Sequence, residues 1–78
     1  MLFGETEGRA WLNANLSGVD FQGTNLSDAK LVGVTAWGVT LYESNLTNAN
    51  LTNARLSRAD MTGANLTDAT LAGALSSC

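Results

Sequence analysis

Large apolar residues recur every five positions along almost the whole chain, and this spacing restricts the possible folds more than any other feature. Ala36 replaces the large residue at one step, and Trp11 extends the series toward the N-terminus. Two positions before each large residue lies a small or β-branched residue, and the position directly before it is often Asn or Asp. The large residues are Leu16, Phe21, Leu26, Leu31, Leu41, Leu46, Leu51, Leu56, Met61, Leu66 and Leu71. The chain is therefore a series of five-residue repeats.

A period of five fits neither an α-helix nor a straight strand. On a helix, five residues advance the chain by about 500°, so the leucines would spiral over every face. On a strand, an odd period would place successive leucines on opposite faces. The leucines share one interior only if the chain bends once per repeat. Successive coils can then pair as in a parallel sheet, with the right-handed sense that parallel crossovers prefer. The spacing predicts an all-β solenoid.

Three strings in the second half of the chain resemble the pentapeptide-repeat consensus, Ala-(Asp/Asn)-Leu-X-X. They are Ala49-Asn50-Leu51-Thr52-Asn53, Ala59-Asp60-Met61-Thr62-Gly63 and Ala64-Asn65-Leu66-Thr67-Asp68. This resemblance implies a right-handed quadrilateral β-helix in which four repeats make one coil. The solenoid is expected over residues 9–78, with about three and a half coils and a height of about 17 Å. The family hosts many roles, so the resemblance says more about fold than about function.

The start of the chain is expected to differ from the repeats. Arg9 occupies a position where a small inward residue is expected. Repeat proteins commonly cover their terminal units with a capping element. We therefore expect residues 1–8 to form an N-terminal cap segment, with Leu2, Phe3 and Trp11 folding over the open end.

Residues 20 positions apart are expected to lie above one another in successive coils. One column then reads Asn25, Asn45 and Asn65, and stacked amides of this kind can hydrogen-bond along the column. Another interior column has Ala36 between Leu16 and Leu56. The small side chain leaves space there, which either a neighbouring large side chain fills or a small void occupies.

The position directly after each core residue is expected to point outward. Most coils carry Ser, Thr or Gln there, but the second coil carries Val32, Trp37 and Tyr42, and Leu12 is expected to stack next to Val32. Exposed apolar residues, and aromatic ones above all, often mark binding sites. We predict that these four residues bind a protein partner or a second copy of the chain. The alternatives are that Trp37 turns inward to fill the space at Ala36, and that the open solenoid ends bind the partner.

The composition argues against catalytic and metal sites. The 78 residues include no histidine and one cysteine, Cys78, so neither an internal disulfide nor the usual kind of zinc site is expected. Two pairs of carboxylates share columns, but each pair is separated by two coil spacings, too far for acid–base work. These pairs are Asp28 with Asp68, and Asp20 with Asp60. We expect a non-enzymatic protein without cofactors.

The charged and apolar residues also limit the expected partners. The formal net charge is -3, and the basic residues are too few and scattered for a nucleic-acid patch. No apolar run is long enough for a transmembrane helix, so membrane contact is expected to be indirect only. No signal peptide is visible, although a processed chain could have lost one. The basic residues are Arg9, Lys30, Arg55 and Arg58.

These observations favour a non-catalytic protein–protein interaction or scaffolding module. The family resemblance implies that it could be an accessory subunit of a larger, photosynthetic assembly, because pentapeptide-repeat proteins are plentiful in cyanobacteria and chloroplast thylakoids. The location would be cytoplasmic, or chloroplast or thylakoid if the chain is processed from a longer precursor. The alternative is a DNA-mimic regulator of DNA gyrase. That role requires a long acidic face, and here Arg55 and Arg58 are expected to interrupt the acids.

Overall fold

A tight turn follows every core residue in the part of the chain that the computed structural model describes, residues 8–75. Within this range the secondary structure consists of two-residue turns and isolated parallel β-bridges, without helices or longer strands. Each bridge joins residues that are 20 positions apart. The bridged pairs are Ala10–Lys30, Asn15–Thr35, Asp20–Thr40, Asn25–Asn45, Lys30–Asn50, Thr35–Arg55, Thr40–Asp60, Asn45–Asn65, Asn50–Thr70 and Arg55–Leu75.

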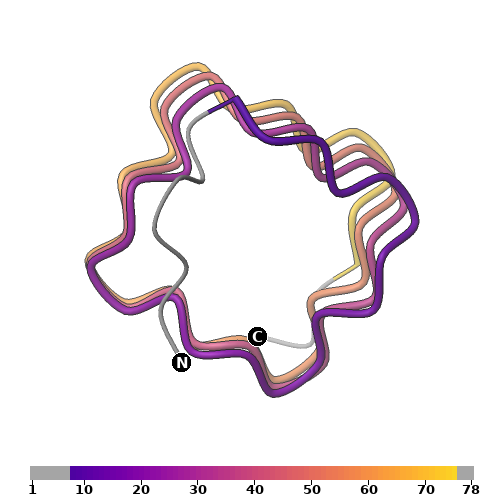
Figure 1. The fold of residues 1–78 in the computed structure, drawn as a ribbon, viewed down its shortest axis with the longest axis horizontal. Helices are drawn as coiled ribbons and strands as arrows, with labels where there is room; N and C mark the ends of the chain where they lie inside the picture. Colours follow the sequence, from indigo (N-terminus) through magenta and orange to yellow (C-terminus); the bar gives the residue numbers. More distant parts are fainter. Residues whose placement is uncertain (1–7, 76–78) are drawn as a thin grey trace.

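The register of 20 residues means that four repeats complete one coil. The chain follows a four-sided path, and successive coils lie over one another (Figure 1). This arrangement is a right-handed quadrilateral β-helix, which confirms the predicted fold class. We number the sides in chain order. Side 1 comprises 9–13, 29–33, 49–53 and 69–73, side 2 comprises 14–18, 34–38, 54–58 and 74–75, side 3 comprises 19–23, 39–43 and 59–63, and side 4 comprises 24–28, 44–48 and 64–68.

Backbone hydrogen bonds both close the corners and join the coils. At each corner an N–H donates to the core carbonyl three residues earlier, as Ala49 N does to Leu46 O over 2.9 Å. Between coils, Leu46 N donates to Asn65 O over 2.8 Å, and Asn45 N donates to Thr24 O over 3.0 Å. The same pattern recurs around the solenoid, so successive coils pair their facing backbone groups although no strand within residues 8–75 is longer than one bridge.

The second residue of every corner has a left-handed backbone conformation. Counted from the core residue, this residue is the third of a four-residue hydrogen-bonded turn, and positive φ at that position is typical of a type II turn. Glycine adopts it freely and Asn or Asp tolerates it, which accounts for most of the residues found there. Glu43 and Arg58 adopt it without that advantage. The corner residues are Gly8, Asn13, Gly18, Gly23, Asp28, Gly33, Gly38, Glu43, Asn48, Asn53, Arg58, Gly63, Asp68 and Gly73.

Replacing Gly23 tests whether this conformation limits the corner sequence. Its φ is 67°, and a Cβ built there would meet nothing within 4 Å, so the effect of a substitution is conformational rather than steric. We expect Gly23→Val to lower the free energy of unfolding by at least about 1–2 kcal/mol, because a β-branched residue is strained at positive φ. Gly23→Asn should cost clearly less. Urea unfolding of both variants measures the difference, and equal costs would contradict the conformational account.

Asn and Asp side chains before the core residues stabilise the backbone locally. The Oδ1 atoms of Asn25, Asn45 and Asn65 accept hydrogen bonds from the backbone N–H two residues later, each over 3.0 Å. The predicted amide ladder therefore has to be reinterpreted, because these oxygens bond within their own coil. Asp60 does the same: the Thr62 hydroxyl and then the Thr62 N–H hold the pKa of its carboxyl below the ordinary value.

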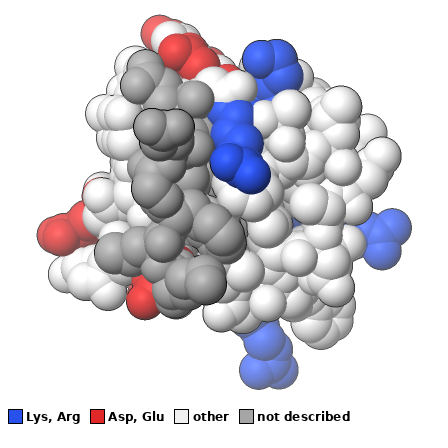
Figure 2. Space-filling model, in the orientation of Figure 1, with Lys and Arg blue, Asp and Glu red and all other residues white. Residues whose placement is uncertain are grey.

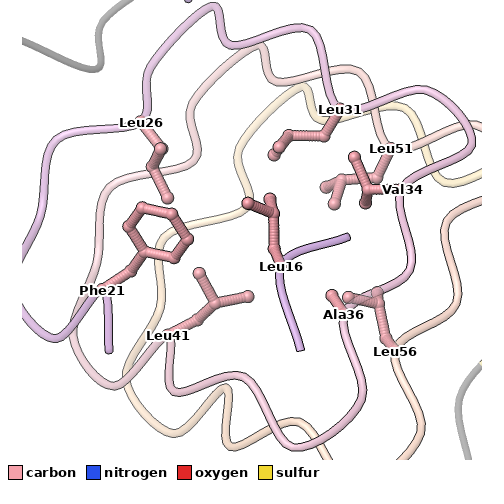
Figure 3. Close-up of a pocket in the computed structure, with 9 residues that line it drawn as sticks. All are labelled: Leu16, Phe21, Leu26, Leu31, Val34, Ala36, Leu41, Leu51 and Leu56. Carbon is pink, nitrogen blue, oxygen red and sulfur yellow. The ribbon is translucent and has the colours of Figure 1, made fainter. Parts of the chain in front are cut away.

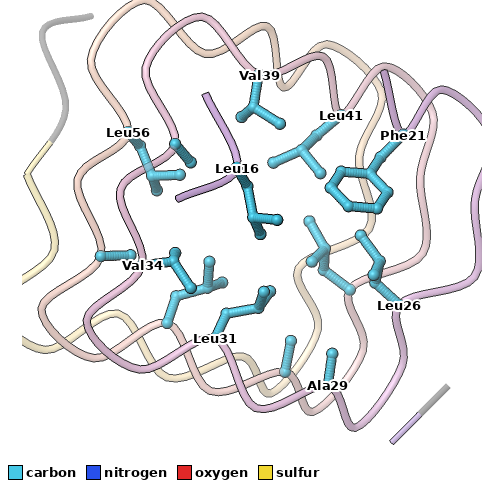
Figure 4. Packing of buried hydrophobic residues seen from close by; sticks show 14 residues of the cluster. Leu16, Phe21, Leu26, Ala29, Leu31, Val34, Val39, Leu41 and Leu56 are labelled. Atoms are coloured by element: carbon cyan, nitrogen blue, oxygen red, sulfur yellow. The ribbon is translucent and has the colours of Figure 1, made fainter. Parts of the chain in front are cut away.

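The core is a single column of leucine, valine, alanine and phenylalanine side chains enclosed by the coils (Figure 4). Leu26 and Leu46 are wholly buried, and small inward residues such as Ala29 and Ala49 fill the space beside them. Beside Ala36 a cavity of about 10 Å³ remains, lined only by apolar side chains (Figure 3). Of the two outcomes expected in this column, the structure shows the small void. Burial decreases in the third coil, where Met61 and Leu66 are half-buried.

At the other end of the core, Trp11 packs against the first coil. Its ring meets Phe21 edge-on, with 5.7 Å between ring centroids and an interplanar angle of 81°. The Arg9 guanidinium carbon lies 4.9 Å from the Trp11 ring centroid, in a cation–π contact. The rest of the predicted cap, residues 1–7 with Leu2 and Phe3, lies outside the described residues. Gly8 N already donates to Ser27 O over 2.9 Å, so the regular coil begins there.

Candidate interaction surface

Trp37 points away from the core. Its side chain is 54% exposed, whereas Ala36 is buried and the space beside Ala36 stays empty. The alternative in which Trp37 fills that space is therefore wrong. Ser17 and Ser57 occupy the same corner in the coils before and after, and Trp37 N donates to Ser17 Oγ over 3.2 Å. The indole thus stands at a corner where its neighbours along the solenoid are small and polar.

Leu12 and Val32 lie together on the preceding corner. Asn13 N donates to Val32 O over 3.0 Å, which fixes the two coils in register there. Leu12 is 59% exposed, and Val32 is half-buried. These two predicted residues therefore form one apolar site at the corner between sides 1 and 2.

Tyr42 lies apart from the other predicted residues. It is half-buried at the corner between sides 3 and 4, followed directly by Glu43. Because every repeat ends in a turn, Val32, Trp37 and Tyr42 occupy three successive corners of one coil. The structure brings Leu12 and Val32 together, places Trp37 at the far end of side 2, and places Tyr42 one side further on. A flat partner could contact two of these corners together, but not all three.

The charged residues divide between two halves of the solenoid. Within residues 8–75, every Lys and Arg lies on side 1 or 2, and every Asp and Glu lies on side 3 or 4. In Figure 2 the acidic side chains accordingly lie along the left edge, from upper to lower left, and the basic ones near the centre and at the top, right and bottom. The basic residues are Arg9, Lys30, Arg55 and Arg58, and the acidic ones are Asp20, Asp28, Glu43, Asp60 and Asp68.

This division corrects the expectation that Arg55 and Arg58 interrupt the acids, because they lie on a different side. It also tests the DNA-mimic alternative. A duplex about 17 Å long carries about ten phosphates spread around its axis. The described part of this chain carries half that number of carboxylates, all on two sides, and its other two sides are basic. The charge pattern therefore does not favour a DNA mimic.

Side 2 combines Trp37 with arginines. Arg55 is bridged to Thr35, so it lies in the next coil on the same side as Trp37. Gly38 N donates to Ser57 O over 2.9 Å, which places the adjacent Arg58 at the Trp37 corner. Both arginines are exposed. Sequence reasoning missed them as site residues, although sorting the sequence into columns of 20 would have found them.

The described residues form no candidate metal site and no membrane-spanning helix. Among residues 8–75, no group of three His, Cys, Asp or Glu side chains could hold a metal ion. In that same range no helix is long and apolar enough to cross a bilayer. Thr40 is bridged to both Asp20 and Asp60, so these two carboxylates lie two coils apart, as predicted. The exposed side chains described above are the features of this surface that a partner could recognise.

Comparison with known proteins agrees with this geometry. The pentapeptide repeats family model matches eight copies, over residues 12–48 and 44–75. Rfr23, a pentapeptide repeat protein from the cyanobacterium Cyanothece 51142, is 32% identical, with a TM-score of 0.59 over 88% of this chain and 50% of that one. A pentapeptide repeat protein from the Arabidopsis thaliana thylakoid lumen is 31% identical, with a TM-score of 0.60 over 90% of this chain and 52% of that one.

A third solved structure is HetL from Nostoc sp. strain PCC 7120, a pentapeptide repeat protein involved in heterocyst differentiation regulation. It is 32% identical, with a TM-score of 0.54 over 87% of this chain and 36% of that one. The chain thus spans about half the length of the first two relatives and less of the third. No curated protein matches. The repeat model and these structures together show that the chain belongs to the pentapeptide repeat family.

Proposed function

We propose that this chain is a non-catalytic protein–protein interaction or scaffolding module. The observation that carries the proposal is the 54% exposure of Trp37 at a corner where the neighbouring coils have serine. A large aromatic side chain costs solubility when it is exposed, and tryptophan is the residue most enriched at binding hot spots. Leu12, with 59% exposure, adds apolar area at the other end of side 2.

The finer proposal is an accessory role in a larger assembly. One relative comes from a thylakoid lumen and another is involved in heterocyst differentiation regulation, both in photosynthetic organisms. These sources support a place for this chain beside a photosynthetic assembly. The partner is a protein or a second copy of the chain, bound through the exposed corner residues rather than through a cofactor.

We expect Trp37→Ser together with Tyr42→Thr to keep the fold and to weaken association by at least about 2 kcal/mol, roughly thirtyfold. Both changes install residues that other coils carry at the same turn position. The measurement is a quantitative pull-down with the immobilised chain from a photosynthetic cell extract, with sedimentation velocity for self-association and a thermal melt of each variant.

Ser27→Thr with Thr47→Ser is the matched control, since it changes two residues at the same turn position, both at the corner between sides 4 and 1, where none of the predicted residues lies. This control should retain the proteins that the unmodified chain retains. Unchanged association of the Trp37 and Tyr42 variant, with an unchanged melt, would remove these residues as the docking site and leave the solenoid ends.

A further inference from the structure

Side 2 and the corners at its two ends form a surface that is both basic and apolar. Its charged or large apolar exposed side chains are Leu12, Trp37, Arg55, Arg58 and Leu75, with half-buried Val32 beside Leu12. Within the described residues, this surface carries no carboxylate. We propose that side 2 binds an acidic segment of a partner protein. This inference rests on the proposed interaction function and specifies the chemistry of the partner.

The arrangement of side 2 suits a segment that carries both acidic and apolar groups. Arg55 lies on the flat of the side, bridged to Thr35, and offers its guanidinium to a partner, while Arg58, which already interacts within the chain, adds positive charge at the Trp37 corner. A guanidinium can bind a carboxylate through two parallel N–H donors, and this geometry selects carboxylates more sharply than a lysine would. Trp37 lies in the coil next to the arginines, and Leu12 lies two coils away at the other end of the side; both can cover apolar side chains of the same segment.

The charge division favours an acidic protein over other polyanions. Proteins that bind nucleic acid through phosphates typically neutralise about six to ten of them. Lipid-binding basic clusters typically hold about four to eight Lys or Arg. Side 2 offers two arginines, with Arg9 and Lys30 on the neighbouring side, in a chain of net charge -3. A few directed ion pairs beside an aromatic anchor fit a protein segment better than a uniformly charged polymer or membrane.

The same division argues against a second copy on side 2. A two-fold dimer through this side would bring the arginines of both copies to one interface, where like charges repel. A contact between side 2 of one copy and the acidic sides of the next would not be two-fold. Such contacts propagate into open chains unless the rotation happens to close. We therefore assign the surface to an acidic segment of another protein.

The test uses the whole chain and synthetic peptides, observed by two-dimensional NMR. The probe is a short peptide of repeated Glu-Ser-Leu-Ser, which presents Glu and Leu on one face when extended. The matched peptide has Lys in place of Glu. We expect the acidic peptide to shift resonances of Trp37, Arg55 and Arg58, and the shifts to diminish with added salt. The lysine peptide should produce no comparable shifts.

Variants separate the local charge from the net charge. Arg55→Gln with Arg58→Gln should weaken peptide binding about tenfold. Gln22→Glu with Asn65→Asp makes the same change of net charge on sides 3 and 4, and should change binding by less than about twofold. Trp37→Ser should weaken binding, whereas Tyr42→Thr should not, since Tyr42 lies beside Glu43 on the acidic half.

Four results would overturn the proposal. They are no shifts on side 2 with the acidic peptide, an unaffected arginine variant, equal weakening in the net-charge control, and stronger binding of side 2 to single-stranded DNA or phosphatidylserine vesicles than to the peptide. If the pull-down depends on Trp37 but the arginine variant behaves as the unmodified chain, the interaction function stands and the acidic partner does not. If neither experiment responds to these changes, both proposals fail.

Discussion

Replacing Leu46 with alanine is expected to lower the free energy of unfolding by about 2–5 kcal/mol, a large part of the stability of so small a domain. Leu46 is wholly buried in the middle coil, with Leu26 and Leu66 in the coils on either side. Paired coils cannot collapse into the cavity without breaking hydrogen bonds such as that from Leu46 N to Asn65 O. Urea unfolding followed by circular dichroism measures the loss.

Leu12→Ala is the control for this prediction, because it makes the same chemical change at a 59% exposed position. Its cost should stay within about 0.5 kcal/mol. Leu46→Asp should prevent folding, since no partner is available for a charge in the apolar column. A soluble Asp variant with the native circular dichroism spectrum would refute the register of the whole solenoid.

Truncating Phe21 to alanine should cost about 3–5 kcal/mol. Phe21 is buried, lines the cavity beside Ala36, and meets Trp11 edge-on. The substitution would enlarge an existing void and remove an aromatic contact that contributes about 0.5–1.5 kcal/mol by itself. Thermal and urea unfolding both report the change.

Phe21→Leu provides the comparison, since Leu41 occupies the same column in the next coil. It should cost much less than Phe21→Ala, because leucine is the residue that most repeats place there. The fluorescence of Trp11 should change in both variants, since both remove the ring against which it packs. Equal costs for leucine and alanine would mean that the aromatic contact, not the filled volume, sets the stability at this end.

Periodicity predicted an all-β solenoid, because a five-residue spacing of large apolar residues admits so few solutions, and the resemblance to the pentapeptide-repeat consensus implied four repeats per coil. The periodicity also predicted that Ala36 would leave space. The sequence does not show whether Trp37 fills that space, because the direction of the indole depends on the backbone conformation at the corner. The structure settles this with Trp37 54% exposed and a cavity beside Ala36.

The hydrogen bonds of the Asn column and the grouping of the arginines were not predicted from the sequence, for two different reasons. The spacing of Asn25, Asn45 and Asn65 suggested bonds between coils, but each Oδ1 accepts from the backbone N–H two residues later, and those of Asn45 and Asn65 also accept from a threonine hydroxyl of the same coil. The basic residues looked scattered because they are distant in the chain. Arg55 and Arg58 gather beside Trp37 only when the sequence is wrapped with a period of 20.

The register of 20 residues has a consequence for how such a chain can change. Inside the solenoid all repeats are nearly equivalent, so losing one whole repeat preserves the pattern of leucines. On the outer surface, however, the loss moves the outward side chains of all later repeats by one side of the solenoid, a quarter of a revolution. Deleting residues 44–48 would carry Arg55 away from Trp37 to the position above Lys30, and would set Asp60 above Thr35 in its place. The five-residue period therefore determines stability, whereas the side of the solenoid on which each repeat falls determines which outward residues a partner meets together.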